Sequence, residues 1–223
     1  MLQDGEKGVV IQRDKSTYAV SPHIPCGVVS PEQLRIIADV AEKYGAQALK
    51  ITSAARIAIV GVEEKDIDGI WKDLGMSQGY AVGLCVRSVK ACPGTTFCKK
   101  GKQDSLGLGL KLDGKYHGVE LPGKCKMGVS GCTNQCAETC IKDIGLVGMP
   151  DGWKVYVGGN GGGKPRLSQE FIRVKSDEEA MATVDKIFEY FRANARPHQR
   201  IGAMIDKMGF DEFKAAVLGD QQG

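Results

Sequence analysis

Four cysteines, arranged in two pairs, are the residues of this sequence best suited to carry chemistry. Cys92 and Cys98 are separated by five residues, Cys132 and Cys136 by three, and 33 residues lie between the pairs. Thiolates are soft anionic donors, so four of them that converge on one site fit either a structural zinc ion or an iron–sulfur cluster. The spacing therefore predicts a metal centre.

The spacing and the neighbouring glycines favour a cluster over a single ion. Zinc sites commonly use C-x₂₋₄-C on both arms and bacterial ferredoxins a C-x₂-C-x₂-C run, and neither pattern occurs here. Pro93 and Gly94 follow the first cysteine and Gly131 precedes the third. Glycine permits close backbone approach, so amide groups can point at cluster sulfides. Two alternatives remain. The first is an electron-transfer protein with a [4Fe-4S] cluster and no further cofactor, and the second is a binding or scaffold protein that is stabilised by zinc.

The other four cysteines do not form closely spaced pairs. We interpret them as packing residues, because free cysteine is among the most buried residue types. Cys140 is a candidate for a thiol near the cluster, since it lies eight residues after Cys132. These four cysteines are Cys26, Cys85, Cys125 and Cys140.

Basic residues lie close to the cysteines in the sequence. Lys124 and Lys126 are two residues apart in a strand-like segment, which places both ammonium groups on one face of the strand. Arg87 stands five residues before Cys92, and Arg56 lies further towards the N-terminus. These four cations could bind an oxyanion.

A glycine-rich loop over residues 158–166 ends in two cations, Lys164 and Arg166, and suits a polyanionic ligand. It matches neither the dinucleotide-binding fingerprint nor a P-loop. A plain flexible turn is the alternative.

Helices and strands that could position these residues follow from the hydrophobic pattern. Ser30, Pro31 and Gln33 form a capping box that opens a helix ending at Gly45. Residues 46–61 predict two strands joined by a turn at 53–55, and residues 63–74 a second helix. Short glycine-rich strands follow, then a helix from Ser176, and one or two short helices over 199–218. We predict an α+β fold with a ferredoxin-like half-domain over 1–78 and a cofactor domain over 79–223.

Composition excludes several classes of protein. No run approaches the roughly 18 apolar residues that span a bilayer, and the N-terminus lacks an export signal, so we expect a cytoplasmic protein without a membrane partner. Eight cysteines in a reducing compartment favour metal ligation over disulfides. The formal charge of +3 is too small to indicate nucleic-acid binding.

Two segments resemble the siroheme-dependent sulfite and nitrite reductases. They run from Arg87 to Ser105 and from Gly128 to Ala137, and carry the paired cysteine motifs. The resemblance extends to residues 52–61, to the loop 158–166 and to the helical tail, covering roughly residues 15–215. It implies an oxidoreductase with siroheme and a [4Fe-4S] cluster.

The resemblance also implies roles for individual residues. Cys92, Cys98, Cys132 and Cys136 would hold the cluster, and Cys136 would also bridge to the siroheme iron. Arg56, Arg87, Lys124 and Lys126 would surround the bound oxyanion. Asn160, Lys164 and Arg166 would contact the carboxylates of the siroheme.

Two departures from the family pattern bear on the substrate and on assembly. Large sulfite reductases carry an arginine where this chain has Ala54, whereas the nitrite-reductase pattern places it at Arg56. Large members contain two copies of this module and this chain contains one, so we expect a homodimer. By family analogy the single module indicates six-electron reduction of sulfite to sulfide, with nitrite as the alternative substrate. No nicotinamide or flavin motif is visible, so we expect an external protein donor such as ferredoxin.

Overall fold

The computed structural model describes residues 1–219, which divide into two compact units, the first Met1–Gly83 and the second beginning at Leu84. The segment around residue 78, where the sequence predicted a boundary, is held on the first unit by backbone hydrogen bonds. His23 N donates to Ser77 O at 2.8 Å and Gly79 N donates to Ser21 O at 2.9 Å. This pairing makes the segment part of the first unit instead of a linker.

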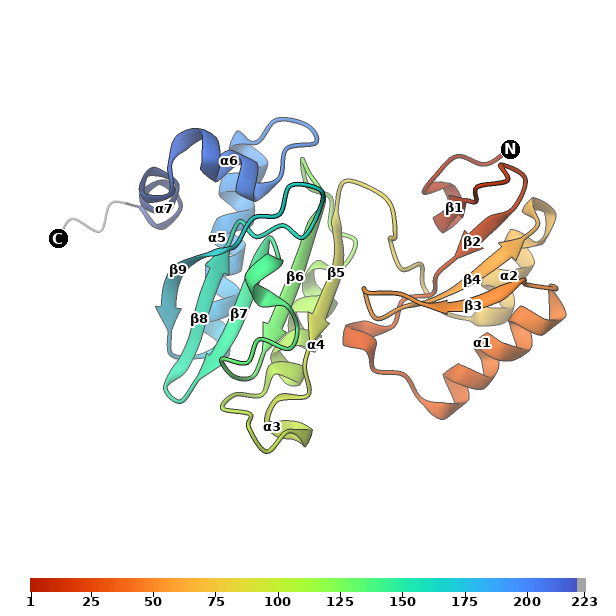
Figure 1. Cartoon of the computed structure of the whole chain (residues 1–223), viewed down its shortest axis with the longest axis horizontal. Coiled ribbons are helices and arrows are strands. Elements are labelled where there is room, and N and C mark those ends of the chain that lie inside the picture. Colours follow the sequence, from red (N-terminus) through yellow and green to blue (C-terminus); the bar gives the residue numbers. More distant parts are fainter. Residues whose placement is uncertain (220–223) are drawn as a thin grey trace. The chain divides into compact units, whose positions relative to one another are not determined.

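The first unit is an antiparallel sheet with two helices packed against it (Figure 1). The strand order is β1-β2-β4-β3. Short 3₁₀ turns η1, η2 and η3 cover Glu6–Gly8, Pro25–Gly27 and Glu64–Asp66. The strands and helices are β1 (Val9–Ile11), β2 (Tyr18–Val20), α1 (Pro31–Lys43), β3 (Ala48–Ile51), β4 (Ile57–Val62) and α2 (Ile67–Leu74).

Local sequence signals explain where these elements begin and end. Gln33 N donates to Ser30 Oγ at 3.1 Å while Ser30 N donates to Gln33 Oε1 at 2.9 Å, which is the predicted capping box. The turn between β3 and β4 closes through the bond from Thr52 N to Arg56 O at 2.8 Å. Gly75, at φ 58°, ends α2 in the left-handed conformation that glycine adopts readily.

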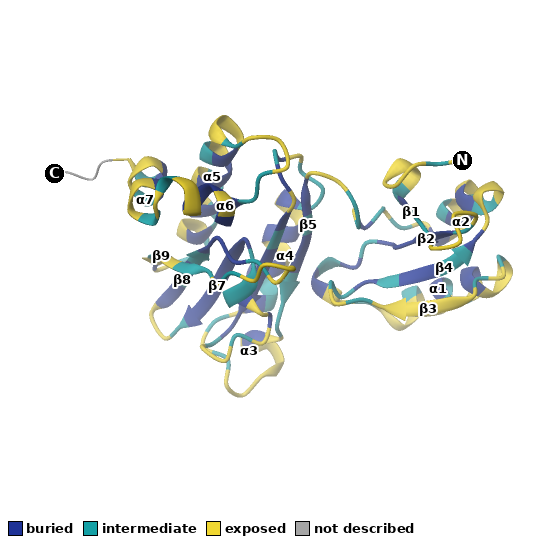
Figure 2. Ribbon diagram, turned by 45° about the horizontal axis from the view of Figure 1, so that its top comes forward, coloured by how far each residue is buried: buried dark blue, intermediate teal, exposed yellow. Residues whose placement is uncertain are grey.

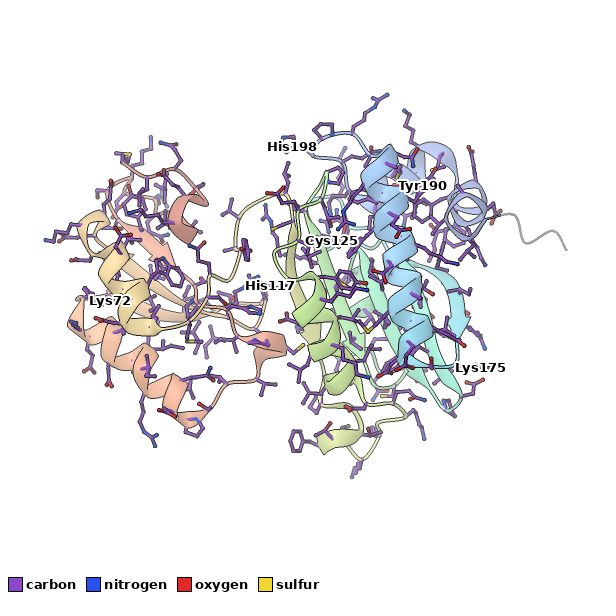
Figure 3. The ribbon with its side chains drawn as sticks, turned by 180° about the vertical axis from the view of Figure 1, so that it is seen from behind. Lys72, His117, Cys125, Lys175, Tyr190 and His198 are labelled. Carbon is purple, nitrogen blue, oxygen red and sulfur yellow. The ribbon has the colours of Figure 1, made fainter. Side chains whose placement is uncertain are left out.

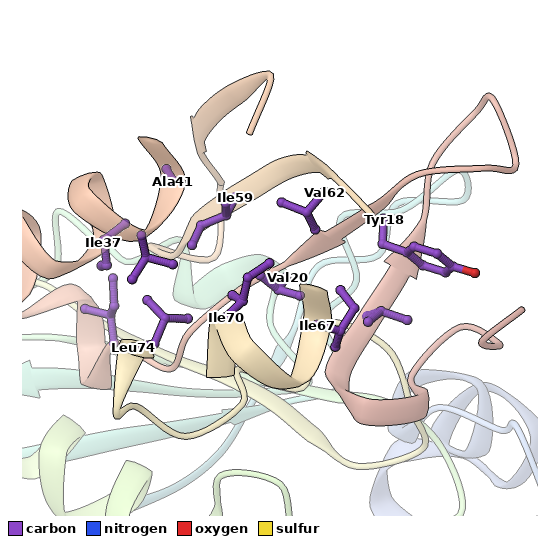
Figure 4. Packing of buried hydrophobic residues seen from close by; sticks show 12 residues of the cluster. Tyr18, Val20, Ile37, Ala41, Ile59, Val62, Ile67, Ile70 and Leu74 are labelled. Atoms are coloured by element: carbon purple, nitrogen blue, oxygen red, sulfur yellow. The ribbon is translucent and has the colours of Figure 1, made fainter. Parts of the chain in front are cut away.

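The core of the first unit lies between the sheet and its two helices (Figure 4). Val20 and Ile59 from the strands meet Ile37 from α1 and Ile70 from α2, and all four side chains are buried. Burial of such side chains stabilises by about 1.5–3 kcal/mol each. This apolar layer fixes the sheet, and with it the hairpin that carries Arg56.

The second unit is built on a five-stranded sheet of order β5-β6-β7-β8-β9, in which β5, β6 and β7 are parallel and the others antiparallel. Helices α4 and α5 pack against one face (Figure 1). The elements are β5 (Val86–Ala91), α3 (Gly94–Phe97), α4 (Ser105–Tyr116), β6 (Cys125–Ser130), η4 (Thr139–Ile141), β7 (Ile144–Met149), β8 (Gly152–Val157), β9 (Gln169–Val174), α5 (Asp177–Asn194), α6 (Ile201–Met208) and α7 (Phe210–Leu218).

Helix α4 was not predicted from the sequence, because three glycines interrupt its hydrophobic pattern. Tertiary packing overrides that weak propensity: Leu108 and Leu112 are fully buried, and the ring of Tyr116 meets Phe188 of α5 edge-on at 5.2 Å. Asp104 caps the helix by accepting a bond from Gly107 N at 2.9 Å. No helix within residues 1–219 has the length and apolar character needed to cross a membrane.

Candidate functional site

Strand β6 has one face towards the helices and an opposite face that carries polar side chains. Cys125 and Met127 are fully buried, and Cys125 lies inside the second unit (Figure 3). The alternation of a strand places Lys126, Gly128 and Ser130 on the opposite face. The sheet thus presents its lysine away from the hydrophobic core.

The segment that follows the second cysteine pair lies on this opposite face. A Cβ atom at Gly128 would come within 2.9 Å of both Ala137 O and Lys142 Cγ, so glycine is needed for this approach. Ala137 N donates to Ser130 Oγ at 3.1 Å. Lys142 is thereby held over the strand that carries Lys126.

The two cysteine-bearing loops are joined through Gly131. Its backbone N donates to Cys92 Sγ at 3.2 Å, and its O accepts from Lys102 N at 2.7 Å. A Cβ atom at Gly131 would lie 2.7 Å from Gly94 Cα and 2.8 Å from Gln103 O. Cys92 and Cys132 therefore belong to one tightly packed structure, as the flanking glycines predicted.

The four predicted ligands all retain access to solvent. Cys98 and Cys136 are exposed, while Cys92 and Cys132 are half-buried. No three His, Cys, Asp or Glu side chains among residues 1–219 are placed to hold a single metal ion. The four predicted ligands are therefore not gathered around one point in this structure, and their role as ligands stays a prediction.

Five cations of the second unit lie near one another. The pKa of Lys126 lies below its ordinary value because the side chain is half-buried and because Lys142, Arg200, Lys124 and Arg87 add positive charge around it. Arg87 stands at a register shift between β5 and β6, and such bulges re-aim side chains. The structure places Arg87 and Lys124 near Lys126 and adds Lys142 and Arg200, and Lys124 precedes β6 instead of lying within it.

Asp143 and Arg200 were missed by the sequence reading. Arg200 Nε donates to Asp143 Oδ1 at 2.9 Å and its Nη2 donates to Oδ2, which makes a bidentate pair with a fully buried carboxylate. Lys126 N donates to the same carboxylate at 2.7 Å. Burial raises the pKa of Asp143, and Arg200 opposes that rise. The partners are 57 residues apart, so no local pattern could have signalled them.

The glycine-rich loop 158–166 is joined to this network. Arg200 Nη1 donates to Asn160 Oδ1 at 2.6 Å, and Asn160 and Arg166 exchange two backbone hydrogen bonds of 2.8 Å. The Arg166 guanidinium contacts Asp206, Gly158 O and Gln169, which fastens the ends of the loop. Lys164 is exposed at the loop tip.

Arg56 and the remaining cysteines lie elsewhere. Arg56 is buried in the first unit beside the β3–β4 turn, where its N donates to Thr52 Oγ1 at 3.2 Å. Cys26, Cys85 and Cys125 are buried, in keeping with a packing role, and Cys140 is half-buried. Burial also raises the pKa of the Cys125 thiol well above its ordinary value.

Two family models together span almost the whole chain. Residues 82–222 match the nitrite and sulphite reductase 4Fe-4S domain, and residues 10–77 match the nitrite/sulfite reductase ferredoxin-like half domain. The first match alone covers more than half of the chain. The chain belongs to the family of siroheme- and [4Fe-4S]-dependent sulfite and nitrite reductases. The predicted α+β fold, the oxidoreductase class and the two cofactors are thereby confirmed.

Individual relatives differ in how much of their own length this reductase matches. It is 41% identical over 218 residues to the assimilatory-type sulfite reductase of Nitratidesulfovibrio vulgaris, covering 98% of this chain and 100% of that protein. It is 41% identical to the nitrite reductase [NAD(P)H] of Bacillus subtilis, with 95% of this chain but only 26% of that protein covered. The chain therefore spans about a quarter of that nitrite reductase.

Solved structures show the same fold at low sequence identity. Dissimilatory sulfite reductase I superposes with a TM-score of 0.81 at 15% identity over 90% of this chain and 69% of the other. The NirA protein of Mycobacterium tuberculosis superposes with a TM-score of 0.78 at 19% identity. The match covers 96% of this chain and 43% of that protein.

The residues of this reductase fit the two cofactors. The glycines packed around Cys92 and Cys132 leave no room for side chains, so backbone amides line the cysteine loops, as the sulfides of a cluster require. The nearby cation group suits the carboxylates of siroheme and an oxyanion substrate. Both features are built by this chain alone.

Gly131→Ala is expected to reduce cluster incorporation several-fold and to lower stability, because the new methyl group would overlap Gly94 and Gln103 backbone atoms. Iron content per chain and the unfolding midpoint measure the effect. Gly114→Ala is the matched control: nothing lies within 4 Å of its Cβ position, and alanine in helix α4 adds about 0.5–1 kcal/mol of stability. Equal iron content in the two variants would contradict the role of Gly131.

Proposed function

We propose that this chain catalyses the six-electron reduction of sulfite to sulfide. The observation that carries the proposal is the end-to-end match to an assimilatory-type sulfite reductase, combined with the group of cations around Lys126. We further propose Cys92, Cys98, Cys132 and Cys136 as the cluster ligands and Cys136 as the residue shared with the siroheme iron. Asn160, Lys164 and Arg166 are proposed to contact siroheme carboxylates.

When bound, siroheme and the cluster supply the iron site and the electrons for cleavage of S–O bonds. The protein residues supply charge and protons. Arg87 and Arg56 are proposed to hold the anion, since a planar guanidinium matches the geometry of an oxyanion. Lys126 is the better proton donor, because its lowered pKa eases release of the ammonium proton to a departing oxygen. Lys124 is proposed to share this role.

Lys126→Met is expected to lower the turnover number by about 10²–10⁴-fold, the range typical of a lost general acid. Methionine is similar in length and removes charge from a group that other cations surround, so the fold should be retained. Anaerobic steady-state kinetics of protein with both cofactors loaded measures the effect. Unchanged turnover at full loading would remove Lys126 from the mechanism.

Nitrite is the second candidate substrate, and a specific observation favours it. Arg56 occupies the position of the nitrite-reductase pattern, and several relatives in the comparison are named nitrite reductases, including that of Bacillus subtilis. Anaerobic kinetics with both anions decides between the substrates. A higher kcat/KM for sulfite is expected, and a higher value for nitrite would reverse the assignment.

We propose that electrons arrive from a separate protein such as ferredoxin, and that the enzyme works as a homodimer in the reducing cytoplasm. The eight free cysteines support a reducing compartment. A dimer mass is expected in native mass spectrometry at micromolar concentration, and a monomer mass would contradict it.

A further inference from the structure

The segment Pro93–Gln103, here named the ligand-loop tip, combines an exposed aromatic ring with unshielded positive charge. The side chain of Phe97 is 80% exposed, and Lys99, Lys100 and Lys102 are exposed as well. The tip contains no acidic residue. Aromatic residues such as phenylalanine are enriched at protein–protein interfaces.

The charges of the tip are not neutralised within the described part of the chain. None of its three lysines pairs with a carboxylate in residues 1–219, whereas Lys90 and Lys142 both pair with Glu138. The nearest acid in sequence, Asp104, is committed to accepting bonds from Thr96 Oγ1 and Gly107 N. The lysines are therefore available to an external partner.

Backbone hydrogen bonds hold the tip in one position beside the second cysteine loop. Cys98 N donates to Gly94 O at 2.9 Å, Gly101 N to Cys98 O at 2.9 Å, and Lys102 N to Gly131 O at 2.7 Å. Helix α3 and the loop that follows it lie on the surface at one end of the second unit (Figure 2). The tip is thus a fixed surface around the exposed Cys98, not a loose loop.

We propose that the ligand-loop tip is the docking surface for a small acidic iron–sulfur electron carrier. The proposal rests on the proposed function, since it assigns Cys98 to the cluster. An acidic carrier is complementary to three unpaired lysines, and Phe97 provides an exposed apolar anchor in the same segment. Docking here brings the carrier next to a ligand of the cluster that must accept the electron.

Each encounter transfers one electron: the reduced carrier is oxidised by one electron and the enzyme is reduced by one. Six encounters supply the electrons for one sulfite, and the protons come from solvent through the lysine donors. The carrier must therefore bind briefly and leave, which suits a small surface whose association is driven by charge.

The test compares Lys99→Glu/Lys100→Glu with the matched control Lys186→Glu, which reverses an exposed charge on α5. The probe is an acidic plant-type [2Fe-2S] ferredoxin, with reduced methyl viologen as a small donor that needs no docking surface. The double variant should raise the KM for ferredoxin about tenfold or more and flatten its salt dependence, as loss of steering charge does. Turnover with the dye and iron content should stay unchanged.

The outcomes separate the two proposals. Equal ferredoxin KM values in the double variant and the control, or ferredoxin that fails to bind the wild-type enzyme in calorimetry, would overturn the docking surface. Absent turnover of the loaded wild-type enzyme with the dye would instead overturn the proposed function. Phe97→Ala gives an independent measurement, because it weakens ferredoxin binding without altering any charge.

Discussion

Cys132→Ser is expected to yield protein that lacks the [4Fe-4S] cluster and has no measurable sulfite turnover. A serine hydroxyl is a far poorer ligand for iron than a thiolate, and the remaining three proposed ligands leave one iron of the cube without a protein thiolate. Cys132 follows Gly131, which already bonds to Cys92 Sγ at 3.2 Å, so the variant alters a proposed ligand at the junction of both loops. Iron and acid-labile sulfide per chain, measured after anaerobic purification, give the result.

Cys140→Ser is the matched control for this prediction. Cys140 is half-buried in the same segment and is not among the proposed ligands. Its replacement should leave iron, sulfide and turnover close to wild type. Loss of the cluster in Cys140→Ser but not in Cys132→Ser would contradict the ligand assignment.

Arg200→Met is expected to lower the free energy of unfolding by about 3–5 kcal/mol, because it leaves the buried carboxylate of Asp143 without its ionic partner. The Lys126 amide would remain as a hydrogen-bond donor to that carboxylate. Denaturant unfolding of the purified protein measures the change.

An exposed ion pair provides the comparison. Arg173 pairs with Glu170 at 2.9 Å but is 64% exposed, so Arg173→Met should cost less than about 1 kcal/mol. The double variant Asp143→Asn/Arg200→Met should recover part of the lost stability, since no buried charge is then left unpaired. A loss for Arg200→Met no larger than that for Arg173→Met would show that the buried pair contributes little.

The elements with strong local signals were predicted from the sequence, and those set by distant contacts were not. The capping box at Ser30 and the capped helix from Ser176 occur where their residues predicted them, because both depend on neighbours in sequence. Helix α4 was missed, since its glycines argue against a helix and only the packing of Leu108 and Leu112 stabilises it. The pairing of Ser77 and Gly79 with His23 and Ser21 likewise joins residues far apart in the sequence, so no local pattern near the predicted boundary at residue 78 indicates it.

The same division holds for the candidate site. Cysteine spacing and glycine placement pointed to the loops that the structure joins through Gly131. The place of Lys126 on the polar face of β6 follows from the alternation of a strand, whereas Lys124 precedes β6, which begins at Cys125. Lys142 and Arg200 reach Lys126 only through the folded chain, and nothing in their local sequence distinguishes them from surface cations. The ligand assignments themselves remain predictions for the experiments above.

The carboxylate of Asp143 has a consequence for how this enzyme can change. It binds the backbone of Lys126 and the side chain of Arg200, and Arg200 in turn holds Asn160. A substitution that shifts any one of these groups therefore displaces the others. The proposed substrate contacts and the proposed tetrapyrrole contacts thus share one hydrogen-bond network, so laboratory evolution towards a different anion should select compensating changes in the loop 158–166.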